Sequence, residues 1–384
     1  MRRYTLYSGL YRFFSGVVLL LLNWHIASAQ DGGYDVLAVS TALSFVPAVF
    51  VPSLIRFVPI ADGARMTAAG LAGVALTLLV IAAGYSHVQA VVALNFVLWI
   101  FFFYLESAWE VWFNDEASGL DGDALRRSSS LTMTVNQVAL MVGPLFAPLF
   151  TRVVRAEWVL VVCAALFAVV AVLSLGARRA TASSGEQAAE ESRPKITGGL
   201  GVLYLLAFMF VWPILGTFNF MLPLQVLANG GSMLTVGILD MLLGIGMAVA
   251  GTFLHRLTKN PGLRWILLGA AAAVVAAMAV WLFFPAFGVP QSIAIFILGC
   301  AFGSLRVILR SEAASNFSPQ QVGAIVAHAN AYSLLLLSAV LAGGRYFSSH
   351  IWLAPFALTL LLVLSFHRIH AVQGRRLIPS EVSE

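Results

Sequence analysis

Residues 157–176 read EWVLVVCAALFAVVAVLSLG, residues 177–198 read ARRATASSGEQAAEESRPKITG, and residues 199–218 read GLGVLYLLAFMFVWPILGTF. The first and third stretches are apolar, and each is long enough to cross a bilayer core of about 30 Å as a helix of around 20 residues. The middle stretch is polar, charged and rich in Ser and Ala, which is typical of a flexible linker. This linker divides the chain into two halves of nearly equal length.

Apolar runs of the same kind fill both halves. The chain is 60% hydrophobic and 10% charged, whereas a soluble domain carries roughly 25% charged residues. The runs lack the alternation of strands, and lipid offers the backbone no hydrogen-bond partners, so we expect helices. The predicted spans are 10–29, 35–56, 66–84, 88–108, 131–151, 157–176, 200–226, 234–255, 265–284, 290–308, 322–343 and 351–369.

The sequence therefore predicts an all-α membrane protein with twelve transmembrane helices in two pseudo-symmetric six-helix bundles. The expected domains are a first bundle at 1–176, a cytoplasmic linker at 177–198 and a second bundle at 199–384. A weak internal repeat supports a duplicated unit. Gly32-Gly33 and Gly230-Gly231 occupy matching outer turns, and many secondary transporters are built from such repeats.

The net charge of +5 is a topology signal. If the N-terminus lies inside, 19 of the 22 Lys and Arg residues fall on one side of the membrane, the exceptions being Arg152, Arg155 and Arg345. Cytoplasmic loops carry such an excess, which places both termini in the cytoplasm. We therefore expect a lipid bilayer around the chain and no nucleic-acid partner.

The N-terminus imitates a cleavable signal peptide. Arg2 and Arg3, the apolar run 17–22 and the small residues Ala27-Ser28-Ala29 match the three parts of such a peptide. Its removal would leave eleven spans and break the symmetry of six plus six. We therefore expect the first helix to be retained.

Two stretches bear on how the helices pack and move. Residues 139–148, ALMVGPLFAP, place Gly143-Pro144 between small residues, and residues 251–259, GTFLHRLTK, contain Gly251 and Arg256. Small residues let helices approach closely and Pro kinks a helix. The first stretch resembles the fifth-helix antiporter motif of the major facilitator superfamily, and the second resembles its cytoplasmic Gly-x-x-x-Asp-Arg loop. The resemblance implies gating roles; a generic kinked, close-packed helix is the alternative for Gly143-Pro144.

Two further stretches carry the most specific likeness. Residues 219–230, NFMLPLQVLANG, and 237–246, GILDMLLGIG, are similar to helices seven and eight of the bacterial drug and siderophore exporters, the branch of the enterobactin exporter. The chain departs from the family where His255 replaces the usual Asp of the cytoplasmic loop. The fourth-helix Arg motif of many proton-coupled antiporters is also absent.

This resemblance implies a secondary active transporter of the bacterial inner membrane. It implies a monomer that exports a small amphipathic molecule, siderophore-like or drug-like, by proton antiport and alternating access. A solute importer of the same fold stays open as an alternative. A membrane receptor or assembly partner that transports nothing is a second alternative, from a different functional class.

Asp240 is the leading candidate for proton coupling. It lies inside the predicted eighth span, where a carboxylate costs on the order of 2.5–3.5 kcal/mol on insertion scales and is expected to face the bundle interior. Burial favours the neutral form of a carboxyl, so a proton could bind and leave during transport. The alternative is a buried Asp satisfied by a hydroxyl or amide.

Further candidates are polar residues on predicted spans. Asn95 and Glu106 share a face of the fourth span with Trp99 and Phe102, an arrangement that would suit an amphipathic or cationic substrate. Arg306, in the equivalent tenth span, would pair with Glu106 to close the inner mouth, attract an anionic substrate, or act as a positive-inside anchor. Four more side chains are candidates for the cavity, with anchoring and interhelical hydrogen bonds as alternatives: Asn23, His25, Asn136 and Asn219.

The sequence contains no recognised catalytic or cofactor motif. There is no phosphate-binding Gly-rich Lys loop, no paired-His metal motif and no Gly-x-Ser-x-Gly elbow. Cys163 and Cys300 lie inside predicted spans, where we expect packing and no disulfide. We therefore predict that the protein is not an enzyme and has neither a cofactor nor a metal site.

Overall fold

A computed structural model describes most of the chain. The described residues are 1–29, 33–55, 62–117, 122–176, 199–257, 263–284, 288–317 and 319–376. The predicted linker 177–198 lies outside them, so the proposed domain boundaries stay predictions.

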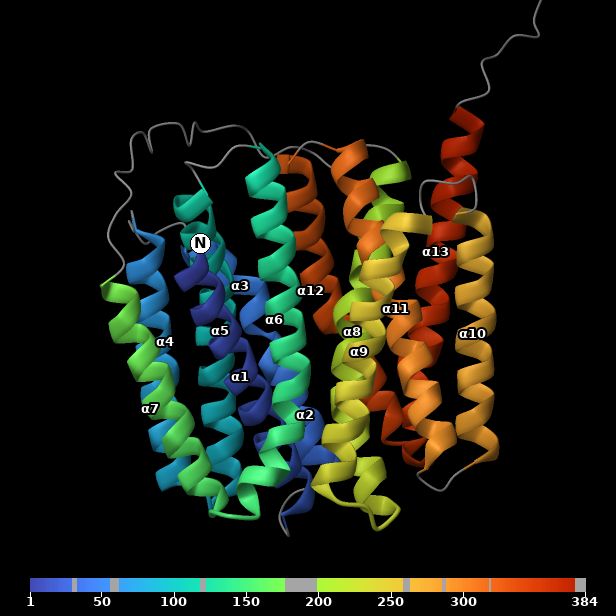
Figure 1. Ribbon diagram of the computed structural model, residues 1–384. Helices are drawn as coiled ribbons and strands as arrows, with labels where there is room; N and C mark the ends of the chain where they lie inside the picture. Colours follow the sequence, from blue (N-terminus) through green and yellow to red (C-terminus); the bar gives the residue numbers. More distant parts are fainter. Residues whose placement is uncertain are drawn as a thin grey trace, which may run out of the picture. The chain divides into compact units, whose positions relative to one another are not determined.

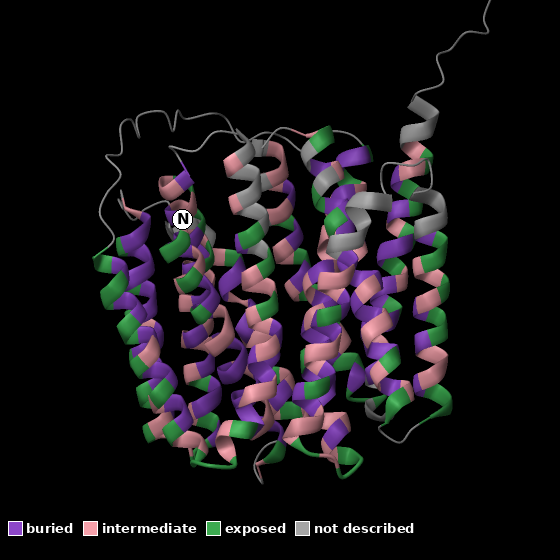
Figure 2. Cartoon of the chain, viewed as in Figure 1, coloured by how far each residue is buried: buried purple, intermediate pink, exposed green. Residues whose placement is uncertain are grey.

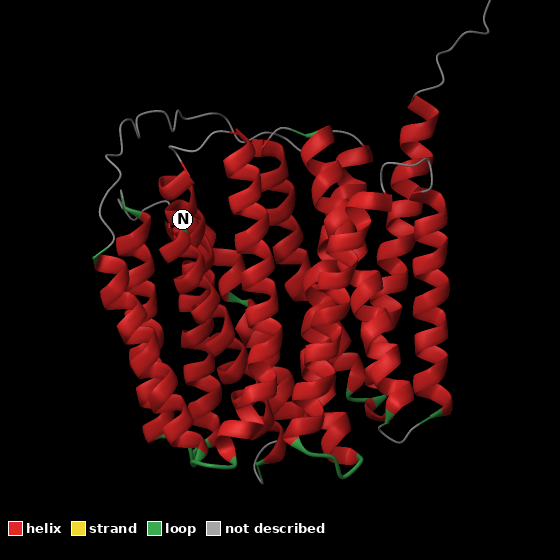
Figure 3. Ribbon diagram, in the orientation of Figure 1, coloured by secondary structure: helices red, strands yellow, loops and turns green. Residues whose placement is uncertain are grey.

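All regular structure in these described ranges is helical (Figures 1 and 3). The helices of the first half are α1 (Arg2–Ser28), α2 (Tyr34–Phe45), α3 (Pro47–Ile55), α4 (Gly63–Ala83), α5 (Val88–Ala117), α6 (Gly122–Thr151) and α7 (Ala156–Leu175). Those of the second half are α8 (Gly199–Ala228), α9 (Met233–Leu257), α10 (Leu263–Phe283), α11 (Val289–Asn316), α12 (Pro319–Gly344), the 3-10 helix η1 (Ser348–Leu353) and α13 (Ala354–Arg376). The predicted all-α class is confirmed.

Length and apolar composition mark a multi-pass membrane protein. Among the described residues, eleven segments are long and apolar enough to cross a membrane, and α10 adds a shorter apolar stretch, Leu267–Phe283. Figure 2 shows exposed residues along the full length of α7, and several of them are large and apolar, including Trp158 and Val172. Such an exposed apolar surface on a helix is what lipid contact requires. Each predicted span therefore corresponds to a helix or, for the second span, to a helix pair.

Pro47 divides the second predicted span. The sequence predicts one helix over 35–56, whereas the structure has α2 and α3, separated at Val46. Pro47 has no backbone N–H to donate, and its ring crowds the preceding turn. The Val46 N–H consequently donates to the carbonyl of Leu43 at 3.1 Å, three residues back, in place of the four-residue spacing of an α-helix.

The described chain forms two compact units. The first comprises the residues up to Gly176 together with Leu222–Gly244, which joins the end of α8 to the beginning of α9. The second comprises α8 up to Met221 and the residues from Ile245 onward.

In the first unit, α1 packs along α6, and α4 packs against both α5 and α7. Glycine brings α1 and α6 together, because a Cβ atom on Gly143 would collide with the carbonyl oxygen of Phe13 and lie 3.2 Å from Gly16 Cα. The crossing is reinforced by polar contacts, since Ser8 Oγ donates to Asn136 Oδ1 at 2.8 Å.

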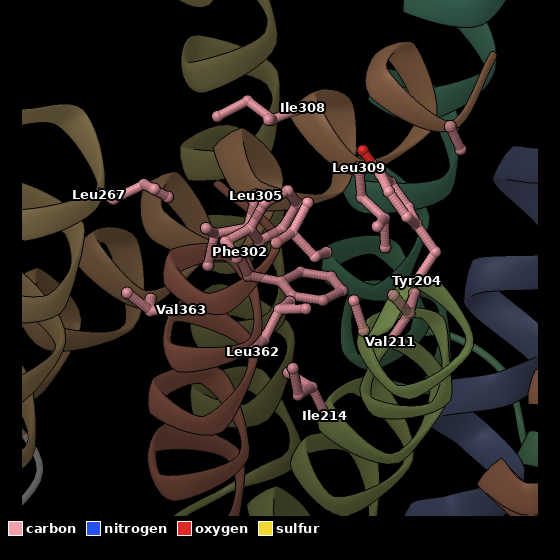
Figure 4. Packing of buried hydrophobic residues seen from close by; sticks show 14 of the residues in the cluster. Tyr204, Val211, Ile214, Leu267, Phe302, Leu305, Ile308, Leu309, Leu362 and Val363 are labelled. Atoms are coloured by element: carbon pink, nitrogen blue, oxygen red, sulfur yellow. The ribbon is translucent and has the colours of Figure 1, made fainter. Parts of the chain in front are cut away.

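The second unit has an apolar core to which α8, α10, α11, α12 and α13 contribute. Figure 4 shows Tyr204, Val211 and Ile214 of α8 against Phe302 and Leu305 of α11, with Leu362 and Val363 of α13 beside them. Leu267 contributes from α10. Phe302, Leu362 and Tyr204 are fully enclosed, so this core fixes the helices that carry the polar groups of the second unit.

Each unit repeats the same packing pattern internally. In the first, α4 contacts α5 and α7; in the second, the equivalent α10 contacts α11 and α13. Tyr4 and Tyr204 are 200 residues apart, and the hydroxyl of each donates a hydrogen bond to the helix of the fourth span in its own half. Tyr4 donates to Trp109 O of α5, and Tyr204 donates to Glu312 Oε2 of α11. This correspondence supports the internal repeat expected from the sequence.

Candidate functional site

Asp240 lies inside the membrane-spanning part of α9. It is the eighth residue of this helix, so at 1.5 Å per residue it lies about 10 Å along the axis from Met233. Its neighbours one turn away on the same face are Gly237 and Gly244. The two glycines decide what this face touches.

The face of α9 that carries Asp240 packs against α6. A Cβ atom on Gly237 would lie 2.9 Å from the carbonyl oxygen of Pro144, and one on Gly244 would collide with the side chain of Met141. Only glycine permits so close an approach of two helices. The structure thus brings together two motifs that the sequence presents separately, the Asp240 stripe and Gly143-Pro144.

The Asp240 carboxyl has no ion-pair or hydrogen-bond partner among the described residues. The side chain is half-buried. A carboxylate in a membrane-spanning helix normally pairs with another group or marks an ion pathway. The predicted alternative, a buried Asp satisfied by a hydroxyl or amide, has no support in the described part of the chain.

Glu106 on α5 forms an ion pair that the sequence did not predict. The Arg12 guanidinium on α1 binds it with both nitrogens, Nη1 to Oε1 at 2.5 Å and Nη2 to Oε2 at 2.7 Å. The Arg12 side chain is 23% exposed and that of Glu106 is 48% exposed. This two-point contact between planar groups is the strongest geometry an ion pair adopts, so Glu106 is held at this position on α5.

An aromatic ring lies next to the ion pair, and further rings follow it along α5. The guanidinium carbon of Arg12 lies 5.3 Å from the centre of the Tyr11 ring. Tyr11 packs against Phe102 and Trp109 of α5, and Trp99 packs against Phe102 and Phe103. The aromatic residues predicted to line the fourth span therefore pack together, with Tyr11 of α1 as an added member, and their role in binding stays a prediction.

Asn95 and His25 lie at separate positions in the first unit. Asn95 is buried and donates from Nδ2 to Ser40 Oγ of α2 at 3.0 Å. The Oδ1 atom of Asn95 is buried without a hydrogen-bond partner among the described residues, and so is the Nε2 atom of His25. The His25 ring stacks on Tyr85 with centroids 3.9 Å apart, which fits anchoring at the end of α1.

The three other asparagine candidates differ in environment. Asn136 joins α6 to α1 through the hydrogen bond from Ser8. Asn23 is half-buried on α1, and Asn219 is exposed on α8. Of these three, Asn136 alone makes a side-chain hydrogen bond within the described chain, which supports its interpretation as an interhelical contact.

The remaining candidates lie on α9 and α11. Arg306 is half-buried on α11. Gly251 and Arg256 fall in the last two turns of α9, where the structure describes the backbone. A predicted pairing of Glu106 with Arg306, and the gating roles of Gly251 and Arg256, stay predictions.

A second polar cluster, also missed from sequence, lies in the second unit. Glu312 of α11 accepts a hydrogen bond from the Tyr204 hydroxyl at 3.1 Å and lies 3.1 Å from His370 Nε2 of α13. Asn316 donates to the same Tyr204 hydroxyl at 3.3 Å. The only sequence signal was the presence of Glu312 and His370 near the ends of their spans. Within the described ranges, no group of three His, Cys, Asp or Glu side chains is placed to hold a metal ion.

Comparison with known proteins gives fold neighbours and no sequence relatives. No known family profile matches the chain, and no curated protein matches it. A mutant of the nucleoside transporter NupG superposes with a TM-score of 0.75 at 13% identity, covering 96% of this chain and 98% of that one. A bacterial homologue of the iron transporter ferroportin, in an inward-facing state, gives a TM-score of 0.68 at 12% identity with the same coverage.

These likenesses extend over nearly the whole of each chain, so they concern the complete arrangement of helices. At such low identity they carry no substrate and no direction of transport. Together with the repeated six-helix pattern, they show that this multi-pass membrane protein has the major facilitator fold.

Proposed function

We propose that the protein is a secondary active transporter that exports a small amphipathic molecule, siderophore-like or drug-like, in exchange for protons. The fold neighbours are transporters by name, of a nucleoside, of iron and of a metal. Their fold supports transport as the general activity. The export direction rests on the likeness of Gly143-Pro144 and residues 237–246 to exporter sequences.

Asp240 is the observation that carries the proposal. This carboxyl lies inside a membrane-spanning helix, close to a glycine-mediated helix contact, and has no partner in the described chain. Such a carboxyl is suited to bind and release a proton. When the α6–α9 contact changes during transport, the surroundings of this carboxyl change with it. Its affinity for a proton would then differ between the two states, which is the requirement for coupling.

The proposed mechanism is rocking of residues 1–176 against residues 199–384. Gly143 and Pro144 would permit the movement of α6, and Gly251 and Arg256 would act at the cytoplasmic end of α9. We further propose a monomer in the bacterial inner membrane, as the resemblance implies, and we place both termini in the cytoplasm on the distribution of Lys and Arg.

The first experiment identifies the substrate and the direction of transport. Small molecules in the medium and in the cytosol are compared between source cells with and without the gene, under iron limitation. A compound that accumulates inside the deletion strain and disappears from its medium would be the substrate of an exporter. An unchanged medium with slower uptake of a supplied solute would instead establish an importer.

The second experiment tests coupling. In inverted membrane vesicles energised with a pH gradient, the identified compound should accumulate with the wild-type protein and with Asp240→Glu, which keeps the carboxyl. Asp240→Asn removes the titratable group at nearly the same volume, so gradient-driven accumulation should fall to the level of empty vesicles. Exchange of the compound without a gradient should persist. Full accumulation by Asp240→Asn would remove Asp240 from the coupling mechanism.

A further inference from the structure

The ion pair between Arg12 and Glu106, here called the charge fork, lies at matching depths of two antiparallel helices. Arg12 is near the beginning of the predicted span 10–29, and Glu106 is near the end of the predicted span 88–108. Tyr4 contacts α5 further toward the same end, through its hydrogen bond to Trp109 O at 3.0 Å. The fork therefore lies at the end of the first unit that the distribution of positive charge assigns to the cytoplasm.

The charge fork is exposed on the side of Glu106. Nearly half of the Glu106 side chain is exposed, while Arg12 is enclosed between Glu106 and the Tyr11 ring. Further along the same face of α5, Glu110 and Asn114 are exposed as well. A row of exposed polar side chains is costly against lipid, so this face of α5 is expected to meet water. Toward the middle of the helix, the half-buried rings of Trp99 and Phe103 continue this face.

The charges of Arg12 and Glu106 limit which ligands could replace the ion pair between them. A ligand with only an anionic group could bind Arg12, but its charge would repel the neighbouring Glu106 carboxylate. A ligand with only a cationic group could bind Glu106, but its charge would repel the neighbouring Arg12 guanidinium. A ligand with a charge of one sign is attracted by one residue of the fork and repelled by the other. A ligand with one charge of each sign satisfies both residues.

From this we infer that the charge fork is a recognition site for zwitterions, in which a substrate carboxylate binds Arg12 and a substrate ammonium binds Glu106. An apolar or aromatic body attached to these groups would lie on Trp99 and Phe103. The inference rests on the proposed transport function and adds the charge class of the substrate to it. No bond is made or broken, and each ionic contact of the fork is exchanged for one with the ligand.

The test uses three probes that share a phenyl ring and differ in charge: phenylalanine, 3-phenylpropanoate and 2-phenylethylamine. Binding of each radiolabelled probe to the full-length protein in detergent is measured by scintillation proximity. In the wild type, phenylalanine should bind at least about tenfold more tightly than either singly charged probe. Glu106→Gln should shift the preference to the anion, because Arg12 is freed. Arg12→Gln should shift it to the cation.

Glu110→Gln is the matched control. Glu110 is exposed one turn from Glu106 on the same helix and makes no ion pair with a described residue, so its removal should leave the order of the three probes unchanged. A purely structural fork would weaken all three probes equally in both fork variants, and that result would overturn the inference. Absence of phenylalanine binding to the wild type would overturn it too. Neither result would decide the transport proposal, which the Asp240→Asn experiment tests separately.

Discussion

Gly143 leaves no room for a side chain at the α1–α6 crossing. An added Cβ would meet the carbonyl oxygen of Phe13, which belongs to a helix backbone and cannot move aside alone. Overpacking of this kind costs about 1–3 kcal/mol, more than the roughly 1 kcal/mol that Ala gains over Gly in a helix interior. We therefore expect Gly143→Ala to lower the melting temperature of the protein in detergent.

The matched control is Gly269→Ala on α10. An added Cβ at Gly269 has no heavy atom within 4 Å, so the helix propensity of Ala should act alone and the melting temperature should stay equal or rise. Equal melting temperatures for the two variants would contradict the close α1–α6 contact.

Single residues could be predicted where they violate the apolar pattern of a span. Asp240 and Asn136 are recognisable in this way, because each is a polar side chain within an otherwise apolar run. The partner of such a residue could not be predicted. Arg12 and Glu106 are 94 residues apart in the chain, and in the sequence Arg12 is only one more positive charge on the predicted inner side. Pairing depends on how two helices are rotated about their axes, which hydropathy does not report.

At the scale of the helix, the two equivalent tyrosines allow a comparison inside one molecule. Tyr4 donates to a backbone carbonyl, whereas Tyr204 donates to the Glu312 carboxylate, which also contacts His370. A hydrogen bond to a neutral group contributes about 0.5–1.5 kcal/mol, and one to a charged group about 1.5–3 kcal/mol. Tyr204→Phe should therefore destabilise the protein more than Tyr4→Phe does.

Thermal unfolding in detergent measures this difference, with wild type and both variants prepared in parallel. Both hydroxyls are lost from buried rings, so the two substitutions remove the same atoms from similar packing. A larger loss of stability in Tyr4→Phe would show that the Tyr204–Glu312 contact contributes less than its charge implies.

The helices themselves could be predicted well, since each predicted span has its counterpart in the structure. The division of the second span at Val46 could not be predicted from hydropathy, because Pro47 lies within a run that remains apolar on both sides. Proline alone does not decide the outcome: Pro144 and Pro148 lie inside α6 without ending it. Hydropathy therefore does not distinguish the proline that divides a span from the two that lie within a continuous helix.

At the scale of the whole molecule, the polar linker and the equal halves were enough to predict a duplicated six-helix architecture. They could not predict which helices touch. In lipid, an apolar face is suited equally to a neighbouring helix or to acyl chains. The close packing of α1 on α6, and of α4 on α5, involves glycines that have no fixed spacing along the chain.

The orientation of the whole chain in the membrane is the remaining property that the charge distribution predicts. We expect the N-terminus on the cytoplasmic side and the connections at Ser86 and Tyr346 on the outer side. The test uses a variant with Cys163→Ala and Cys300→Ala, into which one cysteine at a time is introduced at exposed positions: Arg2→Cys, Ser86→Cys or Tyr346→Cys. Intact inner-membrane spheroplasts are then treated with a maleimide that does not cross membranes.

Cysteines at positions 86 and 346 should be labelled in intact spheroplasts, and the cysteine at position 2 only after the membrane is permeabilised. The physical reason is the cost of translocating positive charges, which favours the orientation that would keep 19 of the 22 Lys and Arg residues in the cytoplasm. Because Ser86 and Tyr346 lie in different halves of the chain, labelling of both from outside requires an even number of crossings between them. The reverse pattern would contradict the cytoplasmic assignment of the termini and would move the charge fork to the outer face, where it would meet an imported solute first. Labelling at position 86 alone would contradict the count of crossings between the two positions.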